Sequence, residues 1–325
     1  MFPTDFAYAR ARSLDEALDL LDEAAAAGEE AKLIAGGQSL LPMMKLRLAA
    51  PQVLIDLSDL EELKRGQRTG YGHTIGALTT YRQLGRRRHV YRDGTPAPVN
   101  GVASLVDEVP ALGDALAVLA DPQVRARGTI GGAVAHGDPA ADLPAVLLAV
   151  DAELAIASRK GERVAALDGF LHGIYTTDLA EDEIITHVRI RTAGARGSAY
   201  EKFPHPASHL PIAGVCAVVR LKDGLIERAE VAVTGISPCP YRARDAESLL
   251  SGAPPTPDAL AAAATRVTRQ GGQQVSLLGD QHASGPYRAH LAEVLARRAL
   301  ATALDRARAA TEEPATEEPA TEERP

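Results

Sequence analysis

Two glycine-rich segments contain the residue types that could bind an anion. Residues 33–42 and residues 129–142 each place a Gly-Gly pair directly after apolar residues. Glycine lets backbone N–H groups turn toward an anion, and its missing Cβ lets that anion approach closely. Ser39 and Thr129 would add hydroxyl donors. Either pair alone could simply mark a tight turn, but two such segments could hold a pyrophosphate from both sides.

Other motifs that bind phosphate or carry a nucleophile are missing from the sequence. There is no Gly-x-Gly-x-x-Gly, and Gly132 and Gly137 have P-loop spacing but are followed by Asp138-Pro139 instead of Lys-Ser/Thr. The segment 37–41 lacks the second glycine of a hydrolase nucleophile elbow. No His-Glu-x-x-His occurs, and the nine histidines are scattered. We therefore expect neither a catalytic side chain nor a metal site in this chain.

The composition is typical of a globular protein without a basic face. The 325 residues carry 35 Lys+Arg and 43 Asp+Glu, a formal net charge of −8, which argues against a nucleic-acid partner. The most apolar run, 143–157, is broken by Asp151 and Glu153 and is too short to span a membrane. The chain begins with no apolar signal core, so we expect a cytoplasmic protein. Cys216 and Cys239 are too few for a four-thiolate iron–sulfur cluster.

Hydrophobic spacing predicts helices and short strands around both glycine-rich segments. Ser13 and Glu16 have capping-box spacing at the start of a helix that should end near Gly28. Buried strands are predicted at 32–35 and 53–57, so the first glycine-rich segment would follow the end of a strand. The other predicted elements before residue 170 are short strands at 71–78, helices at 79–84, 111–120 and 143–150, and a hairpin of 153–157 with 163–167.

The last third of the chain has strands first and helices last. The predicted strands are 183–190, 197–203, 213–221 and 225–234, and the predicted helices are 243–250, 257–268 and 287–309. Asp223-Gly224 would form the turn of a hairpin. This order favours an antiparallel sheet backed by helices, so the predicted fold class is α+β. The closing Ala-Thr-Glu-Glu-Pro repeat is acidic and poor in apolar residues, which is typical of disorder.

The order and content of these motifs resemble the FAD-binding medium subunit of the molybdenum hydroxylases. That family includes aerobic carbon monoxide dehydrogenase and the flavin portion of xanthine dehydrogenase. The resemblance covers about residues 1–300, and its matching segments are 2–3, 35–42, 45–48, 75–80, 121–125, 129–142, 175–177, 200–203, 205–208 and 234–237. The segment 86–99, a predicted surface loop, is longer than is usual in the family.

The resemblance implies a two-lobed FAD-binding domain of the PCMH type, like that of the vanillyl-alcohol oxidase superfamily. A C-terminal antiparallel sheet with helices, like that of the carbon monoxide dehydrogenase flavoprotein, would follow it. The implied divisions are 1–58 and 59–178 for the two lobes, 179–308 for the C-terminal α+β domain and 309–325 for a disordered acidic tail.

The resemblance also implies which residues contact FAD. The two glycine-rich segments would form the cradle of the pyrophosphate, and Asp142 would bind the hydroxyls of the flavin's sugar alcohol. Leu119 and Ile185 would be apolar contacts, and Lys202 a polar one. The implied cofactor-binding residues are Leu33, Ile34, Ala35, Gly36, Gly37, Gln38, Ser39, Leu40, Leu119, Thr129, Ile130, Gly131, Gly132, Ala133, Asp142, Ile185 and Lys202. Many relatives have Asn where this chain has Ala133, so one side-chain contact is lost.

These residues also have purely structural interpretations. Asp142 lies where a helix should start and could be its N-cap, a role compatible with binding FAD. Lys202 could be a solvated strand residue. His136 fits a hydrogen-bonding loop residue better than a base, and Tyr175 and Tyr200 fit half-buried positions in a sheet.

The implied function is electron transfer within a larger enzyme. In the family, substrate is oxidised at a molybdenum cofactor on a large subunit, electrons pass through [2Fe-2S] clusters on a small subunit, and FAD hands them to an outside acceptor. We therefore expect FAD in this chain, the other cofactors on partner chains, and a dimer of heterotrimers. Two alternatives remain open. A stand-alone flavin oxidoreductase of the same superfamily would need its own substrate pocket, and a flavin-free scaffold is favoured only by Ala133.

Overall fold

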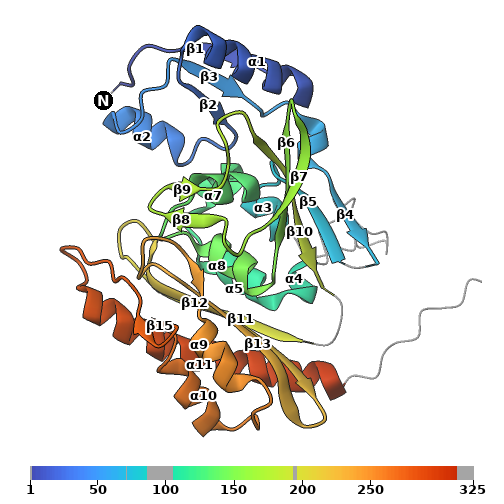
Figure 1. Cartoon of the computed structure of the whole chain (residues 1–325), viewed down its shortest axis with the longest axis vertical. Coiled ribbons are helices and arrows are strands. Elements are labelled where there is room, and N and C mark those ends of the chain that lie inside the picture. Colours follow the sequence, from blue (N-terminus) through green and yellow to red (C-terminus); the bar gives the residue numbers. More distant parts are fainter. Residues whose placement is uncertain (1, 71, 86–104, 193–195, 313–325) are drawn as a thin grey trace, which may run out of the picture.

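The computed structural model describes residues 2–70, 72–85, 105–192 and 196–312. Figure 1 shows three parts along the long axis of the molecule: an N-terminal lobe, a second lobe, and a C-terminal sheet with helices. The predicted surface loop 86–99 and the acidic repeat from residue 313 onward lie outside the described residues. No helix within the described ranges is long and apolar enough to cross a membrane.

The first lobe is a small parallel sheet with two helices. Its strands are β1 (Ala7–Arg10), β2 (Ala31–Ile34) and β3 (Val53–Asp56), paired in the order β1-β3-β2. Its helices are α1 (Leu14–Ala27) and α2 (Leu40–Leu46). The Ser13 hydroxyl accepts a hydrogen bond from the Glu16 N–H, and Gly28 ends α1 with a φ of 72°, which confirms both predicted helix ends. Strand β1 is not predicted from the sequence, because it is mostly exposed and its residues do not alternate between apolar and polar.

The second lobe is an antiparallel sheet with helices packed on it. The strand order is β4 (Gly66–Thr69), β5 (Gly72–Gly76), β10 (Ile184–Arg191), β6 (Glu153–Ser158) and β7 (Gly161–Ala166). The short helices are η1 (Glu61–Lys64), α3 (Tyr81–Leu84), α4 (Leu105–Glu108), α5 (Pro110–Val118), α6 (Pro122–Arg127), α7 (Ile130–His136) and α8 (Asp142–Ala149). A small hairpin of β8 (Leu171–Gly173) and β9 (Thr176–Thr177) lies beside them.

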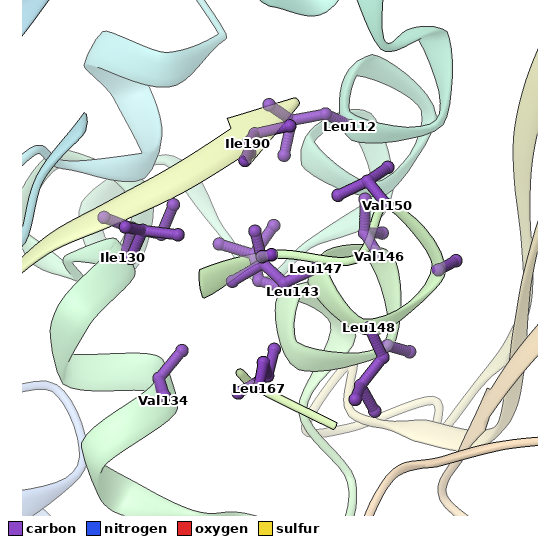
Figure 2. Packing of buried hydrophobic residues seen from close by; sticks show 14 of the residues in the cluster. Leu112, Ile130, Val134, Leu143, Val146, Leu147, Leu148, Val150, Leu167 and Ile190 are labelled. Atoms are coloured by element: carbon purple, nitrogen blue, oxygen red, sulfur yellow. The ribbon is translucent and has the colours of Figure 1, made fainter. Parts of the chain in front are cut away.

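Helix α8 occupies the centre of the second lobe. All of its residues are buried, which explains why its sequence is apolar on every side. Figure 2 shows Leu143 and Leu147 of α8 lying between Ile130 of α7, Leu112 of α5 and Ile190 of β10. Because α8 also packs against the C-terminal sheet, its first residue, Asp142, is held between the two parts.

Strand β10 belongs to the sheet of the second lobe. It pairs antiparallel with β5 on one side and β6 on the other, so that Val188 lies opposite both Ile75 and Leu154. The sequence division at residue 178 instead assigns this strand to the C-terminal domain. Strand alternation alone does not show which sheet a strand joins. We propose, from this pairing, that the second lobe extends to about residue 192.

The C-terminal part is an antiparallel sheet covered by helices, which confirms the α+β fold class. Its strands pair in the order β11 (Gly197–Pro204), β12 (Pro211–Lys222), β13 (Leu225–Thr234) and β14 (Tyr241–Arg242), and its helices are α9 (Arg244–Leu250), α10 (Pro257–Ala264) and α11 (Gly285–Glu312). A two-stranded ribbon, β15 (Arg269–Gln270) with β16 (Gln273–Gln274), links α10 to α11. The predicted hairpin turn is confirmed, since Asp223 and Gly224 both have positive φ. Because α11 continues to Glu312, residues 309–312 are helical rather than part of the predicted tail.

Candidate functional site

The first glycine-rich loop has an open backbone. It leaves the end of β2 and turns at Gly37, whose φ of 72° is readily adopted by glycine. The N–H groups of residues 36–39 make no hydrogen bond within the described part of the chain. The Ser39 side chain is exposed and makes no capping hydrogen bond to α2. This loop can therefore donate several hydrogen bonds to an anion.

The first loop also rests against the second lobe. A Cβ placed on Gly36 would lie 2.1 Å from the carbonyl oxygen of Arg127, at the end of α6. Only glycine permits this approach between the two backbones. Since Arg127 is two residues ahead of Thr129, the two predicted segments are brought together in space, as the sequence interpretation requires.

The second glycine-rich loop has a closed backbone. The N–H of Ile130 donates to the Thr79 carbonyl (3.1 Å), and the N–H of Gly131 donates to the Ala77 carbonyl (2.9 Å). The N–H of Gly132 donates to the Thr129 hydroxyl at 3.2 Å, which makes Thr129 the N-cap of α7. The prediction that these N–H groups turn toward an anion is therefore wrong for this loop.

The two glycines of the second loop have different surroundings. A Cβ on Gly131 would lie 2.5 Å from the Ala77 Cβ, so Gly131 allows α7 to pack against the chain that follows β5. A Cβ on Gly132 would meet only the Thr129 hydroxyl, at 2.8 Å. Gly132 is exposed, and Ala133 beside it is half-buried. The second loop thus offers a smooth, exposed surface at Gly132 rather than a set of free donors.

Asp142 is part of a buried ion pair that joins the second lobe to the C-terminal sheet. The Lys202 ammonium on β11 lies 2.9 Å from Oδ1 and 3.0 Å from Oδ2 of Asp142. The Tyr200 hydroxyl donates to Asp142 Oδ1 at 2.7 Å. The Lys202 side chain is 1% exposed and the Asp142 side chain 4%. The interpretation of Lys202 as a solvated strand residue is wrong, and so is that of Tyr200 as half-buried.

Asp142 is not a helix cap. The N-cap residue of α8 is Ala141, and the first turn of α8 has no side-chain cap. Burial raises the pKa of the Asp142 carboxyl, whereas the Lys202 charge and the hydrogen bonds from Lys202 and Tyr200 lower it. Burial, together with the Asp142 charge, raises the pKa of Tyr200 well above its ordinary value, so its hydroxyl remains a donor.

The two apolar residues implied as cofactor contacts lie in the core of the second lobe. Leu119 follows α5, and Ile185 is on β10; both are buried in the same cluster. The Leu119 carbonyl accepts a hydrogen bond from the Arg125 guanidinium at 2.7 Å, which orders the turn after α5. These two side chains are therefore part of the hydrophobic core of the second lobe.

The sequence interpretation misses Tyr81, whose ring packs against Gly128, directly before the second loop. A Cβ on Gly128 would lie 2.4 Å from the Tyr81 ring, and the Tyr81 N–H donates to the Gly128 carbonyl at 2.9 Å. Burial and, to a smaller extent, the charge of Asp142 raise the pKa of Tyr81. The available signal was the capping box of Thr80 with Gln83, which fixes the start of α3 directly before Tyr81.

His136 does not have the environment of a proton-transfer residue. Its ring stacks against the half-exposed Tyr175 ring with centroids 4.8 Å apart, and burial lowers its pKa. Among the residues that the structure describes, no group of His, Cys, Asp and Glu could hold a metal ion. The polar groups that the described site presents are the backbone donors of the first loop and the Asp142–Lys202 pair.

Two protein-family models together match most of the chain. A model described as the FAD binding domain in molybdopterin dehydrogenase matches residues 4–192. A model of the CO dehydrogenase flavoprotein C-terminal domain matches residues 198–303. The break between the two matches falls directly after β10.

Curated relatives and solved structures align over nearly the whole chain. The carbon monoxide dehydrogenase medium chain of Hydrogenophaga pseudoflava is 36% identical over 301 residues, which are 92% of this chain and 97% of the relative. The glyceraldehyde dehydrogenase medium chain of Sulfolobus acidocaldarius is 33% identical, over 92% of this chain and 98% of the relative. The solved structure of carbon monoxide dehydrogenase from Hydrogenophaga pseudoflava superposes with a TM-score of 0.84 and 36% identity, covering 94% of this chain and 99% of that chain.

Proposed function

The chain belongs to the family of FAD-binding medium subunits of the molybdenum hydroxylases, and we propose that it holds FAD between its two glycine-rich loops. The observation that carries this proposal is the set of free N–H groups at residues 36–39, held against the second lobe at Gly36. These donors suit a pyrophosphate, which carries several acceptor oxygens and negative charge. Ser39 would add a hydroxyl donor, and Gly132 would leave room for the anion on the opposite side.

Asp142 and Lys202 are proposed as the polar contacts beyond the pyrophosphate. A carboxylate in this position can accept hydrogen bonds from sugar-alcohol hydroxyls, and the ammonium can donate to a polar edge of the flavin. Tyr200 would hold the carboxylate in place from the opposite side through its 2.7 Å hydrogen bond. The buried positions of all three side chains exclude water from their contacts with each other.

The cofactor supplies the redox chemistry when it is bound, and the protein positions it. Residues 33–42 and 129–135 contain no His or Cys, so we propose that FAD is held without a covalent bond. The Cys216 thiol is buried, and burial raises the pKa of both Cys216 and Cys239. Neither thiol is therefore activated for covalent flavin attachment.

The partners are proposed from the cofactors that this chain does not provide. Two cysteines cannot bind a [2Fe-2S] cluster with four thiolates. We therefore propose a small [2Fe-2S] subunit and a large molybdenum-cofactor subunit as partners, in a cytoplasmic dimer of heterotrimers. Electrons would reach FAD in this chain from the small subunit and leave for an external acceptor.

Purification of the tagged full chain from its own cells tests this proposal. We expect flavin absorbance in the visible range, release of all flavin on acid precipitation, and molybdenum and iron in co-purifying chains. A flavin-free chain in the intact complex would show that it is a scaffold. Bound flavin without co-purifying metals would indicate a stand-alone flavin oxidoreductase instead. Metal analysis and mass determination of the complex give the stoichiometry.

A further inference from the structure

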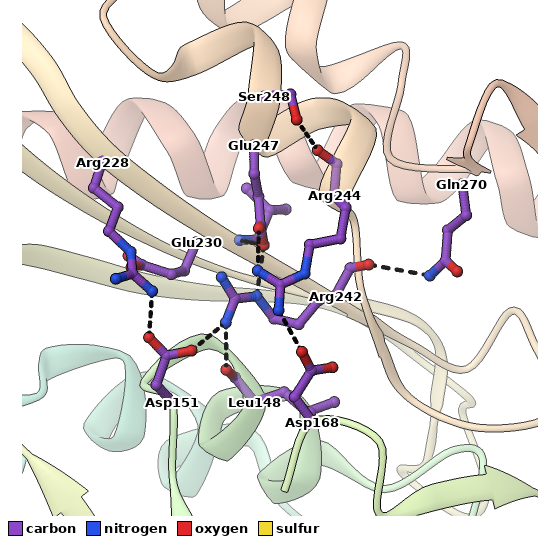
Figure 3. Close-up of polar contacts among 11 residues, drawn as sticks. Leu148, Asp151, Asp168, Arg228, Glu230, Arg242, Arg244, Glu247, Ser248 and Gln270 are labelled. Atoms are coloured by element: carbon purple, nitrogen blue, oxygen red, sulfur yellow. Dashed lines mark hydrogen bonds and ion pairs between the residues drawn. The ribbon is translucent and has the colours of Figure 1, made fainter. Parts of the chain in front are cut away.

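A second polar cluster lies where the second lobe meets the C-terminal sheet. Figure 3 shows Asp151, just after α8, between Arg228 of β13 and Arg242 of β14. Asp151 lies 2.6 Å from the Arg228 guanidinium and 2.5 Å from that of Arg242. Glu230 also pairs with Arg228. Both carboxylates are therefore already neutralised by arginines.

Two further carboxylates at the same junction are also paired. Glu153 at the start of β6 lies 2.8 Å from Arg191 at the end of β10. Asp168, after β7, pairs with Arg244 at the start of α9 (Figure 3). These four carboxylates line a cavity of about 270 Å³, and two of their arginine partners, Arg191 and Arg228, line it as well.

Two arginines that line the same cavity have no such partner. Within the described residues, neither Arg196 nor Arg220 has a carboxylate oxygen within 4.0 Å, and the buried Nε of Arg220 makes no hydrogen bond. Among the described residues, the Arg196 side chain donates one hydrogen bond, to the backbone carbonyl of Arg191 at 2.5 Å. Burial lowers the pKa of Arg196; the charge of Glu230 opposes this shift, the charge of Arg220 adds to it, and the charge of Asp151 opposes it more weakly. A guanidinium nevertheless stays protonated, so both positive charges persist.

The strand register increases the unbalanced positive charge. Arg220 of β12 lies directly opposite Arg228 of β13 in the antiparallel ladder. Like charges in this position destabilise a sheet unless a counter-charge lies between or above them. Among the described residues the acids of this cavity are ion-paired to other arginines, so an anion from outside the chain would be the direct ion-pair partner that Arg196 and Arg220 lack.

We propose that this cavity, the arginine pocket, is a binding site for a small oxyanion of the phosphate class, held by Arg196 and Arg220. Two guanidinium groups suit such a ligand, since each can donate two parallel hydrogen bonds to oxygens of one tetrahedral anion. The cavity is smaller than the pockets of about 300–1,000 Å³ that take drug-sized ligands, so inorganic phosphate or a short phosphate monoester fits it best.

The position of the two arginines indicates what the ligand would do. Arg196 lies in the connection between β10 and β11, which joins the second lobe to the C-terminal sheet, and Arg220 lies inside that sheet. An anion bound to both would fasten the connection to the sheet. Binding would therefore stabilise the junction of the two parts, by a free energy that rises with the logarithm of ligand concentration above the Kd.

Calorimetric titration of inorganic phosphate into the flavin-loaded full chain tests the proposal. We expect one binding event in wild type, with flavin absorbance unchanged, so that exchange at the FAD site is excluded. Arg196→Gln and Arg220→Gln should each weaken binding by about tenfold or more. The matched control is Arg308→Gln, which removes a half-exposed arginine on α11 and should leave the phosphate affinity unchanged.

Thermal unfolding provides a second readout that does not depend on affinity. In phosphate-free buffer Arg220→Gln should raise the melting temperature, because it removes an unpaired, partly buried charge. Phosphate should then raise the melting temperature of wild type and of Arg308→Gln, but not of Arg220→Gln.

A titration with glycerol phosphate identifies which phosphate compound the pocket binds. Tighter binding than inorganic phosphate indicates an organic phosphate, and weaker binding indicates the free ion. Absence of binding in wild type, or equal binding in all variants, would overturn the proposal.

Discussion

The two glycine-rich loops are alike in sequence but differ in how their backbones are used. In the first loop the N–H groups of residues 36–39 bond to nothing in the described part of the chain, and in the second loop those of residues 130–132 are all bonded within the chain. Within each pair, the first glycine allows close packing, since a Cβ on Gly36 or Gly131 would overlap neighbouring atoms. The second glycine, Gly37 or Gly132, would meet only side-chain atoms.

This difference shows that a Gly-Gly pair combines two requirements. The first glycine permits contact between parts of the chain, and we propose that the second leaves room for the cofactor. We therefore expect changes at residues 129–132 to cost mainly stability, and changes in the first loop to cost mainly FAD affinity. Asp142, proposed both as half of a buried ion pair and as a cofactor contact, should affect both quantities. The variants that follow test this division, beginning with the largest expected effect.

Of the variants in and after the second loop, Asp142→Ala should cause the largest loss of unfolding free energy. It would leave the ammonium of the Lys202 side chain, which is 1% exposed, with the Val118 carbonyl as its remaining partner among the described residues. Removing one member of a buried ion pair typically costs about 3–5 kcal/mol, which denaturant unfolding of the flavin-free chain would measure. The double change Asp142→Asn with Lys202→Met removes both charges and should recover most of that loss. A cost near 1 kcal/mol for Asp142→Ala would instead indicate an exposed side chain.

Gly131→Ala should destabilise the chain by about 1–3 kcal/mol, as overpacking of a tight contact does. Its Cβ would lie 2.5 Å from the Ala77 Cβ. The neighbouring change Gly132→Ala is the control, because there only the Thr129 hydroxyl has to move. Loss of that helix cap costs about 1 kcal/mol. Equal unfolding free energies for the two variants would contradict the packing role of Gly131.

Gly37→Ala separates backbone strain from cofactor binding. Gly37 and Gly28 have the same φ of 72°, so alanine should strain both positions by about 1 kcal/mol. Gly28 has nothing within 4 Å of its Cβ position and lies at the end of α1. Flavin titration should therefore show weaker FAD binding for Gly37→Ala than for Gly28→Ala. The two share the backbone strain, and Gly37→Ala adds a contact of its Cβ with the Leu41 Cδ1 at 3.0 Å, which that flexible side chain can relieve. Equal FAD affinity would remove Gly37 from the cradle.

Ser39→Ala should have the smallest effect on stability. Its hydroxyl makes no capping hydrogen bond, so the unfolding free energy should stay within about 0.5 kcal/mol of wild type. If the hydroxyl donates to the cofactor, FAD affinity should fall by up to about tenfold, the value of one hydrogen bond. Thr129→Ala is the counterpart in the second loop, where loss of the α7 cap should reduce stability by about 1 kcal/mol.

The elements that sequence predicts well are those fixed by local signals. Helix α1 has its cap at Ser13 and its stop at Gly28, and the β12–β13 hairpin has the turn Asp223-Gly224. The sequence could not predict which sheet β10 joins. Its partner β5 lies about a hundred residues earlier, and no local sequence signal shows which strands pair.

In the candidate site, too, the features fixed by local signals could be predicted and those fixed by distant contacts could not. Residue types and spacing located both loops, but the use of their N–H groups depends on Ala77 and Thr79, which lie some fifty residues upstream of the second loop. The role of Asp142 depends in the same way on Tyr200 and Lys202, which are 58 and 60 residues away. A helix cap is a local prediction, and a buried ion pair between two domains is not.

The central place of β10 also constrains how the chain folds as it is synthesised. The first-lobe sheet needs only residues up to 56, whereas the second-lobe sheet stays open until residue 191 has left the ribosome. Helix α8, apolar on every side, is made well before its covering strands β10, β12 and β13. Exposed apolar segments of this kind invite aggregation and chaperone binding. We therefore expect FAD to enter a chain that is already almost fully translated.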